Sequence, residues 1–152
     1  MITFSVVTIT YNAAPVLQAT LDSVLMQDYP HVEHLIIDGA STDETVQVAE
    51  SYRQQSAETD NEHVVRIQSE PDNGLYDAMN KGLRLATGDY VVFLNAGDRF
   101  PAADTLDRVV LAAVVGDGEE RPAVLFGDTD IIDEKGNFLC HRRLSPPERL
   151  TW

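Results

Sequence analysis

The sequence predicts an α/β domain with a mainly parallel sheet and helices on both faces. Runs of β-branched and aromatic residues alternate with segments whose apolar residues recur at every third or fourth position. Such alternation is typical of parallel strands joined by right-handed crossovers. The chain has 152 residues, which is long enough for one domain with a substantial core. We therefore expect a single doubly wound domain over residues 1–152.

Five strands are expected from the β-branched runs. They cover residues 4–10, 32–37, 64–68, 90–94 and 123–126. The fourth run is apolar throughout, which predicts a strand buried on both faces. A hairpin is expected near the end of the chain, between residues 129–132 and 138–141.

Segments with helical periodicity separate these strands. Asn12 stands where it could cap the first helix. Ser41-Thr42-Asp43-Glu44 has the form of a capping box at the start of the second. The third helix begins at Leu75 and stops at Thr87-Gly88, and Asp104 is expected to cap the fourth.

Composition and charge exclude several classes of protein. The net charge of −14, from 11 basic and 25 acidic residues, argues against a nucleic-acid-binding face, which needs a basic patch. A single cysteine, Cys140, excludes an internal disulfide framework and a cysteine-rich zinc site. The first residues lack the basic segment of a signal peptide, and no apolar run approaches the roughly 18 residues of a membrane span. We expect a soluble cytoplasmic domain.

Polar residues follow three of the predicted strands: Tyr11 the first, Asp38 the second and Asp98 the fourth. Because the carboxyl ends of parallel strands share one edge of a sheet, where ligands of open α/β sheets bind, these residues are expected to converge. Asp98 suits a divalent cation that shares its ligands with phosphates, although an Asp in a turn is also an ordinary cap. The first turn lacks the glycines of a dinucleotide fingerprint, so a phosphate would be held by a metal and side chains.

Four segments in order resemble the motifs of family 2 glycosyltransferases with the GT-A fold. They are residues 5–12 (SVVTITYN), 36–43 (IIDGASTD), 70–82 (EPDNGLYDAMNKG) and 86–98 (ATGDYVVFLNAGD). The resemblance covers residues 4–132 and is closest to enzymes of bacterial surface polysaccharide, capsule and lipopolysaccharide assembly. It implies a GT-A-type, Rossmann-like fold. It also implies inverting transfer from a nucleotide diphosphate sugar, with UDP favoured, to a saccharide or lipid-linked acceptor.

The resemblance also implies roles for five residues of the nucleotide-sugar site. Tyr11 would offer a flat face to the base with Thr8 beside it, and Asp38 would accept a hydrogen bond from the imide of uracil or thymine. Asp38 could instead supply negative charge at the start of the next helix. Asp77 would lie at the donor sugar or ribose and Lys81 near the phosphates. The alternative for Asp77 and Lys81 is an exposed ion pair, since they are four residues apart on one helix.

Asp98 and Asn95 occupy the place of the family's Asp-x-Asp signature, which implies Mg²⁺ or Mn²⁺ bound to the diphosphate. The amide of Asn95 and the glycine at Gly97 stand where carboxylates often occur, so a less charged metal site is expected. An inverting reaction needs a general base, which the family supplies later in its chain. We expect the base to be absent here, with Asp128 and Asp130 as weak candidates. The chain would then be a donor-binding portion truncated before the acceptor segment.

Two function classes remain open from the sequence. One is the enzyme or its donor-binding part, and the other is a nucleotide-binding or interaction module that keeps the fold without turnover. A receiver-type signalling domain is a distant third, because it explains neither Tyr11 nor the turn at Asp38-Gly39-Ala40-Ser41. For the full-length enzyme, we expect a cytoplasmic location with peripheral association at the inner face of the membrane.

Overall fold

The computed structural model describes residues 1–114, 122–125, 127–133 and 135–142. The chain forms two compact units, Met1–Leu111 and Ala112–Trp152. A single domain over residues 1–152 stays a prediction. The elements are, in order, β1 (Phe4–Thr10), α1 (Ala14–Leu25), β2 (Val32–Asp38), α2 (Thr45–Ala57), β3 (Val64–Ser69), α3 (Leu75–Leu85), β4 (Tyr90–Phe93), α4 (Thr105–Val114), β5 (Asp130–Ile132) and β6 (Phe138–His141).

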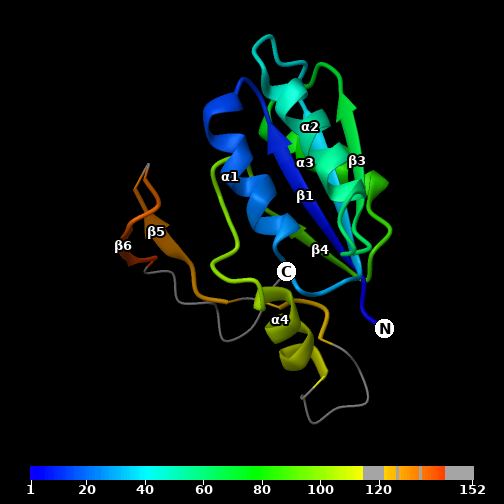
Figure 1. Ribbon diagram of the computed structural model, residues 1–152, viewed down its shortest axis with the longest axis vertical. Helices are drawn as coiled ribbons and strands as arrows, with labels where there is room; N and C mark the ends of the chain where they lie inside the picture. The colour runs from blue at the N-terminus through cyan, green and yellow to red at the C-terminus, as the bar shows by residue number, and fades with distance from the viewer. Residues whose placement is uncertain (115–121, 126, 134, 143–152) are drawn as a thin grey trace. The chain divides into compact units, whose positions relative to one another are not determined.

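The first unit is built on a parallel sheet of strand order β3-β2-β1-β4 (Figure 1). The two central strands, β1 and β2, are buried at every residue. Helices α1, α2 and α3 connect the strands in turn, so all four strands run in the same direction. The expected mainly parallel α/β sheet is confirmed, and the carboxyl ends of the strands lie along one edge.

The core lies in two layers, one on each face of the sheet (Figure 1). The layer under α3 contains Val7, Ile9, Leu35, Ile37 and Ala78. The layer under α1 and α2 contains Leu17, Leu21, Ile36, Ala49 and Tyr52. Successive side chains of a strand point to opposite faces, which is why neighbours in β2 belong to different layers. Helices therefore cover both faces, as the sequence predicts.

Two glycines let other segments lie close to β1. A Cβ atom on Gly82 of α3 would be 2.4 Å from Cγ1 of Val7. A Cβ atom on Gly88, just before β4, would be 2.7 Å from the backbone nitrogen of Ser5 and 2.8 Å from the carbonyl oxygen of Thr3. Side chains at these positions would push α3 and the start of β4 away from the central strand.

The expectation that the fourth strand is buried on both faces is wrong. β4 stands at one end of the described four-stranded order, and its residues are only partly buried. Position within the sheet is a tertiary property, so an apolar run alone does not reveal it. The strand expected at residues 123–126 is also not found: residues 122–125 form no strand, and Phe126 lies outside the described residues. The expected hairpin is confirmed by the antiparallel pair β5–β6.

Asn12 does not cap α1. Its side-chain oxygen accepts a hydrogen bond from the backbone N–H of Thr42 at 2.9 Å, and its own backbone is left-handed, with a φ of 47°. The first free amide of the helix, at Ala14, is instead bound by a carboxylate oxygen of Asp43 at 3.3 Å. Partners some 30 residues away thus replace the local cap, tying the β1–α1 turn to the β2–α2 turn.

The capping box expected at residues 41–44 does not form either. Glu44 occupies the N-cap position of α2 and makes no side-chain capping hydrogen bond. Asp43 accepts the backbone N–H of Thr45 at 3.0 Å, while the Thr45 hydroxyl accepts the N–H of Ala13 at 2.9 Å. Asp43 therefore binds the first amide of α2 as well as the amide of Ala14, so the polar residues of this turn serve both the end of α2 and the neighbouring loop.

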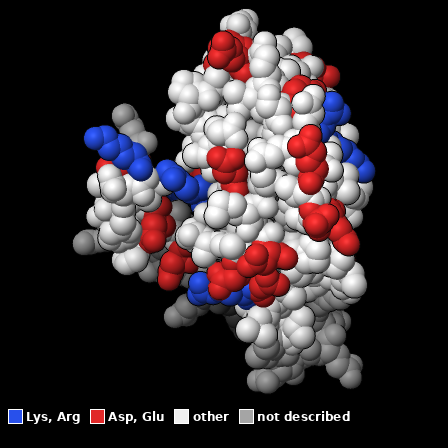
Figure 2. All heavy atoms as spheres, in the orientation of Figure 1, with Lys and Arg blue, Asp and Glu red and all other residues white. Residues whose placement is uncertain are grey.

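Figure 2 shows one face of the molecule, on which Asp and Glu are scattered and Lys and Arg are few. The described residues of this face form no large basic cluster. This distribution agrees with the net charge of −14. Among the described residues, no helix combines the length and apolar character needed to cross a membrane.

Candidate functional site

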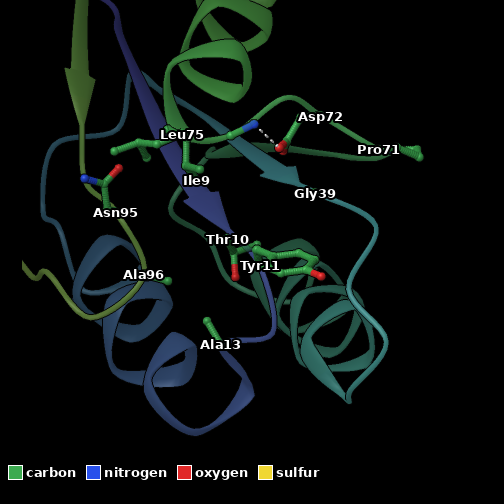
Figure 3. Close-up of a pocket in the computed structure, with 11 residues that line it drawn as sticks. Ile9, Thr10, Tyr11, Ala13, Gly39, Pro71, Asp72, Leu75, Asn95 and Ala96 are labelled. Atoms are coloured by element: carbon green, nitrogen blue, oxygen red, sulfur yellow. Dashed lines mark hydrogen bonds between the residues drawn. The ribbon is translucent and has the colours of Figure 1, made fainter.

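A pocket of about 620 Å³ opens at the carboxyl edge of the parallel sheet (Figure 3). Its walls come from segments that follow all four strands of the sheet. They are Ile9, Thr10, Tyr11, Ala13, Gly39, Pro71, Asp72, Gly74, Leu75, Asn95 and Ala96. The convergence expected from parallel strands therefore produces a real cavity at this edge.

Tyr11 and Gly39 form one side of the pocket (Figure 3). The Tyr11 side chain remains 63% exposed, although it follows a fully buried strand. A Cβ atom on Gly39 would lie 3.3 Å from the Tyr11 ring and 2.7 Å from Oδ2 of Asp72. Gly39 therefore gives the ring and the carboxylate room to approach each other, leaving a flat aromatic face open to a ligand.

Asp38 is the residue before Gly39 and is only 1% exposed. Oδ2 accepts hydrogen bonds from the backbone N–H of Ser41 at 2.9 Å and from the hydroxyl of Ser69 at 2.6 Å. Oδ1 accepts one from the Ser41 hydroxyl. A carboxylate offers about four acceptor positions, so Oδ1 of Asp38 retains one. Asp38 thus organises the ends of β2 and β3; it is not among the residues that line the pocket, and its expected contact with the base stays a prediction.

Thr8 is not among the residues that line the pocket, and its expected place beside the base stays a prediction. It is fully buried, and its hydroxyl is 2.9 Å from Nε2 of His34, whose Nδ1 is 2.7 Å from the hydroxyl of Tyr52. The reason is its place in β1, two residues before the strand ends and within the layer under α1 and α2. Thr8 therefore belongs to a buried polar chain.

Asn95 and Asp98 follow β4, and of the two only Asn95 is among the residues that line the pocket, on the side opposite Tyr11 (Figure 3). The side-chain oxygen of Asn95 is buried and accepts no hydrogen bond from the described residues, and Asn95 lines the pocket. Asp98 is exposed, and its backbone N–H donates to the carbonyl of Asn95 at 2.8 Å across a turn in which Gly97 has a φ of 102°. The unpartnered amide oxygen of Asn95 and the exposed carboxylate three residues later are oxygen donors of the kind that a hard divalent cation prefers.

No cluster of three or more His, Cys, Asp or Glu side chains suited to a metal occurs among the described residues. A cation held by Asn95 and Asp98 would thus take its other ligands from water and from a bound phosphate. That is how Mg²⁺ usually binds in phosphate-handling sites, through one or two protein ligands. The residues therefore fit a shared metal site and not an all-protein one.

Polar side chains of α1 and of Gln27, two residues beyond its end, hold the segment that begins at Gly97. The hydroxyl of Thr20 accepts the N–H of Gly97 at 2.9 Å, and the hydroxyl of Ser23 accepts the N–H of Phe100 at 3.1 Å. The side chain of Gln27 donates to the carbonyl of Ala102 at 2.8 Å and accepts the N–H of Leu106 at 3.1 Å. These three side chains, at helical spacing, fix the backbone from residue 97 to residue 106.

Residues 5–137 match the model of a protein family described as glycosyl transferase family 2. The chain belongs to this family. It is 41% identical over 135 residues to a PGL/p-HBAD biosynthesis glycosyltransferase of Mycobacterium bovis, covering 89% of this chain and 49% of that protein. It is 38% identical over 96 residues to the putative teichuronic acid biosynthesis glycosyltransferase TuaG of Bacillus subtilis, covering 63% and 36%. The chain thus spans about half the length, or less, of these curated relatives.

Solved glycosyltransferase structures share the fold of this family 2 chain. The mannosyltransferase PcManGT from Pyrobaculum calidifontis, in complex with GDP-Man and Mn²⁺, is 36% identical with a TM-score of 0.63, covering 72% of this chain and 31% of that one. S. aureus TarS 1–349, in complex with UDP-GlcNAc, is 28% identical with a TM-score of 0.61, covering 72% and 30%. The expected GT-A fold is confirmed.

Asp72 was not among the predicted site residues, yet it lines the pocket of this glycosyltransferase chain. Its Oδ1 accepts the N–H of Gly74 at 2.8 Å, the dashed contact in Figure 3. Pro, Asp, Asn and Gly are ordinary turn residues, so the composition of this segment does not by itself single out Asp72. Its position in the third family motif, residues 70–82, was the signal that could have identified it.

Asp77 and Lys81 lie on α3 and are not among the residues that line the pocket. Lys81 pairs with Glu70 at 3.0 Å, and Asp77 accepts the N–H of Asn73 at 3.0 Å. Both side chains thus bind the loop that precedes their own helix. Their expected roles at the donor stay predictions.

Asp128 and Asp130 belong to the second compact unit. Both are exposed, and Oδ1 of Asp130 is 2.6 Å from Nδ1 of His141 across the β5–β6 hairpin. Their expected role as general base stays a prediction.

Proposed function

We propose that this chain binds the nucleoside diphosphate sugar donor of a glycosyltransferase that acts in bacterial surface polysaccharide or glycolipid synthesis. The observation that carries the proposal is the pocket at the sheet edge, with the exposed Tyr11 ring on one side and the unsatisfied Asn95 oxygen on the other. Similar proteins support it, since PcManGT is in complex with GDP-Man and Mn²⁺ and TarS with UDP-GlcNAc. The biosynthetic names of the Mycobacterium and Bacillus relatives support the type of product.

On the base side, the ring of Tyr11 would stack on the nucleobase, as exposed aromatic side chains commonly do. The remaining acceptor position on Oδ1 of Asp38 would take the imide N–H of uracil. Guanine presents a different donor pattern, so this contact favours a uridine donor. Asp72, next to Gly39, would complete the wall on the same side.

On the other side, Asn95 and Asp98 would hold Mg²⁺ or Mn²⁺ together with the diphosphate. The bound ion would neutralise charge on the leaving diphosphate. Within this chain, Asn95 supplies a neutral oxygen and Asp98 one negative charge. The turn at Gly97 is fixed by Thr20 and orients both residues.

We further propose an inverting displacement, in which a carboxylate takes the proton of the acceptor hydroxyl, the acceptor oxygen bonds to the anomeric carbon, and the bond from that carbon to the diphosphate on the opposite face breaks. Asp128 and Asp130 are the candidates among the described residues. Asp130 is the less available of the two, because His141 already contacts its carboxylate.

The test is calorimetric titration of the chain with UDP and GDP, each with Mn²⁺. UDP is expected to bind more tightly, and Asp38→Ala is expected to weaken it by about 1.5–3 kcal/mol, the value of a hydrogen bond to a charged group. Ser69→Ala is the matched control, because it removes one structural partner of Asp38 and leaves the acceptor in place. Equal affinity for GDP, or an unchanged UDP affinity in Asp38→Ala, would reject the base assignment. Donor binding without transfer would favour a module that lacks turnover.

A further inference from the structure

We propose that Lys81 and Asp77 are positioning residues that hold the loop Glu70–Gly74 as a fixed wall of the donor pocket, and that Lys81 does not contact the diphosphate. The inference rests on the proposed function and deepens it. It differs from the role near the phosphates that the family resemblance implies for Lys81.

The ammonium group of Lys81 is already engaged by the loop. It donates to the carbonyl oxygen of Pro71 at 2.7 Å and pairs with a carboxylate oxygen of Glu70 at 3.0 Å. The Lys81 side chain is only 13% exposed, whereas that of Glu70 is 48% exposed. An ammonium has three donors, and two of those of Lys81 are used by the loop Glu70–Gly74 at the pocket wall. The hydrogen bond from Lys81 also holds the pKa of Glu70 below its ordinary value.

Asp77, one turn earlier on α3, holds the other end of the same loop. Its Oδ2 accepts the backbone N–H of Asn73 at 3.0 Å and the side-chain amide of Asn73 at 3.4 Å. The backbone N–H of Asn73 is the main reason that the pKa of Asp77 lies below its ordinary value. Together, Lys81 and Asp77 bind the loop on both sides of Asp72.

The held loop forms the base side of the pocket. Pro71, Asp72 and Gly74 all line the cavity, and the loop joins the end of β2 through the N–H of Glu70, which donates to the carbonyl of Asp38 at 3.0 Å. Oδ2 of Asp72 lies where a Cβ atom on Gly39 would come within 2.7 Å. A shift of the loop would therefore move Asp72 relative to Gly39 and Tyr11, and so change the shape of the site for the base.

This arrangement predicts that the loss of affinity caused by replacing Lys81 does not depend on the number of phosphates in the ligand. A lysine that contacts the diphosphate contributes to UDP binding and nothing to uridine binding. A lysine that fixes the base-side wall contributes the same factor to uridine, UMP and UDP, because all three carry the same base and ribose.

The experiment compares wild-type chain and Lys81→Met by NMR titration with uridine, UMP and UDP, each with Mn²⁺. Lys81→Met is expected to weaken all three by a common factor on the order of tenfold, the size of one hydrogen bond to a charged group. A loss that grows from uridine to UDP would overturn the inference and assign Lys81 to the phosphates. Arg84→Met is the matched control: it removes the same charge from an exposed position on the same helix and should change none of the three affinities.

Glu70→Gln provides a second variant, which leaves the ammonium group of Lys81 in place. It is expected to weaken the three ligands by a common, smaller factor, and to be non-additive with Lys81→Met because the two side chains share one contact. Unchanged affinities in Glu70→Gln would contradict a loop held by this pair. Since Glu70 is half exposed, the variant tests the inference even where Lys81→Met fails to fold.

The amide spectrum of the ligand-free protein separates this inference from the proposed function. If the loop is held from α3, Lys81→Met shifts the amide resonances of Asp72, Asn73 and Gly74, while Arg84→Met does not. Unshifted loop resonances would overturn the inference whether or not a nucleotide binds. A wild-type chain that binds no uridine, UMP or UDP would reject the proposed function while leaving this readout intact.

Discussion

At the scale of single residues, burial determines the chemistry of His34. Its ring lies between the hydroxyls of Thr8 and Tyr52 and has no exposed surface. Burial, reinforced by the nearby charge of His63, lowers the pKa of His34 from 6.5 to about 3. A neutral imidazole donates from one nitrogen and accepts at the other, which suits a position between two hydroxyl groups. The polar chain in this layer of the core therefore depends on an uncharged His34.

Stability is expected to fall in mild acid because of this histidine. As the pH falls below 6.5, His34 becomes protonated in the unfolded chain, whereas in the folded chain it stays neutral until about pH 3. The free energy of unfolding should therefore decrease as pH drops through this window, by up to about 1.4 kcal/mol per pH unit. Urea denaturation at pH 7 and pH 5 measures the decrease. His34→Gln should reduce the dependence, with His141→Gln as an exposed control; identical pH slopes in wild type and His34→Gln would contradict the assignment.

At the scale of secondary-structure elements, two helices hold opposite sides of one pocket. Helix α3 binds the loop Glu70–Gly74 through Lys81 and Asp77, whereas α1 binds the segment from Gly97 through Thr20 and Ser23, helped by Gln27 just beyond its end. Because different helices support the two sides, substitutions on each helix should affect different parts of the bound donor.

Thr20→Val tests the α1 side. Valine has nearly the shape of threonine but cannot accept the N–H of Gly97, so the turn carrying Asn95 and Asp98 should loosen. We expect the gain in UDP affinity on adding Mn²⁺ to shrink several-fold, with uridine affinity unchanged. Calorimetry with and without Mn²⁺ measures this gain. Gln18→Ala, on the exposed side of α1, is the control. An equal loss for uridine and UDP would show that Thr20 acts on the whole pocket.

At the scale of the whole molecule, net charge and ligand charge have the same sign. The chain carries −14, and a nucleoside diphosphate is also an anion, so long-range electrostatics oppose their association. Local groups must offset this repulsion. A divalent cation at Asn95 and Asp98 would do so where the phosphates bind, which gives a physical reason to expect metal-dependent binding.

The chain is expected to bind UDP in the presence of Mn²⁺ and to transfer sugar slowly. Among the described residues that line the pocket, the only carboxylate is that of Asp72, which lies beside Gly39 and Tyr11 and across the pocket from Asn95, the proposed diphosphate side (Figure 3). A general base typically contributes about 10²–10⁴-fold, so transfer without a free one should be weak. Binding is measured by titration, and transfer by release of UDP from UDP-sugars with candidate acceptors. Rapid turnover would contradict this expectation, and Asp128→Asn and Asp130→Asn would then identify the base.

Several features could be predicted because they depend on local periodicity. The parallel sheet, the β5–β6 hairpin and the position of Tyr11 at the sheet edge follow from alternating strand and helix patterns. The sequence wrongly predicts that Asn12 caps α1, because its actual partner, Thr42, lies 30 residues away. The half-buried state of β4 could not either, since it depends on which strands lie beside it.

By itself the sequence determined the fold class, the family motifs and the edge of the sheet where a ligand would bind, since each depends on the order and period of residues along the chain. Only the tertiary structure decided which polar groups remain free there. Asp38 is bound by Ser41 and Ser69, Thr8 by His34 and Lys81 by Glu70 and Pro71, whereas the Asn95 oxygen has no partner among the described residues. The physical reason is that hydrogen-bond partners meet through folding, often from distant parts of the chain, and a local pattern does not specify them.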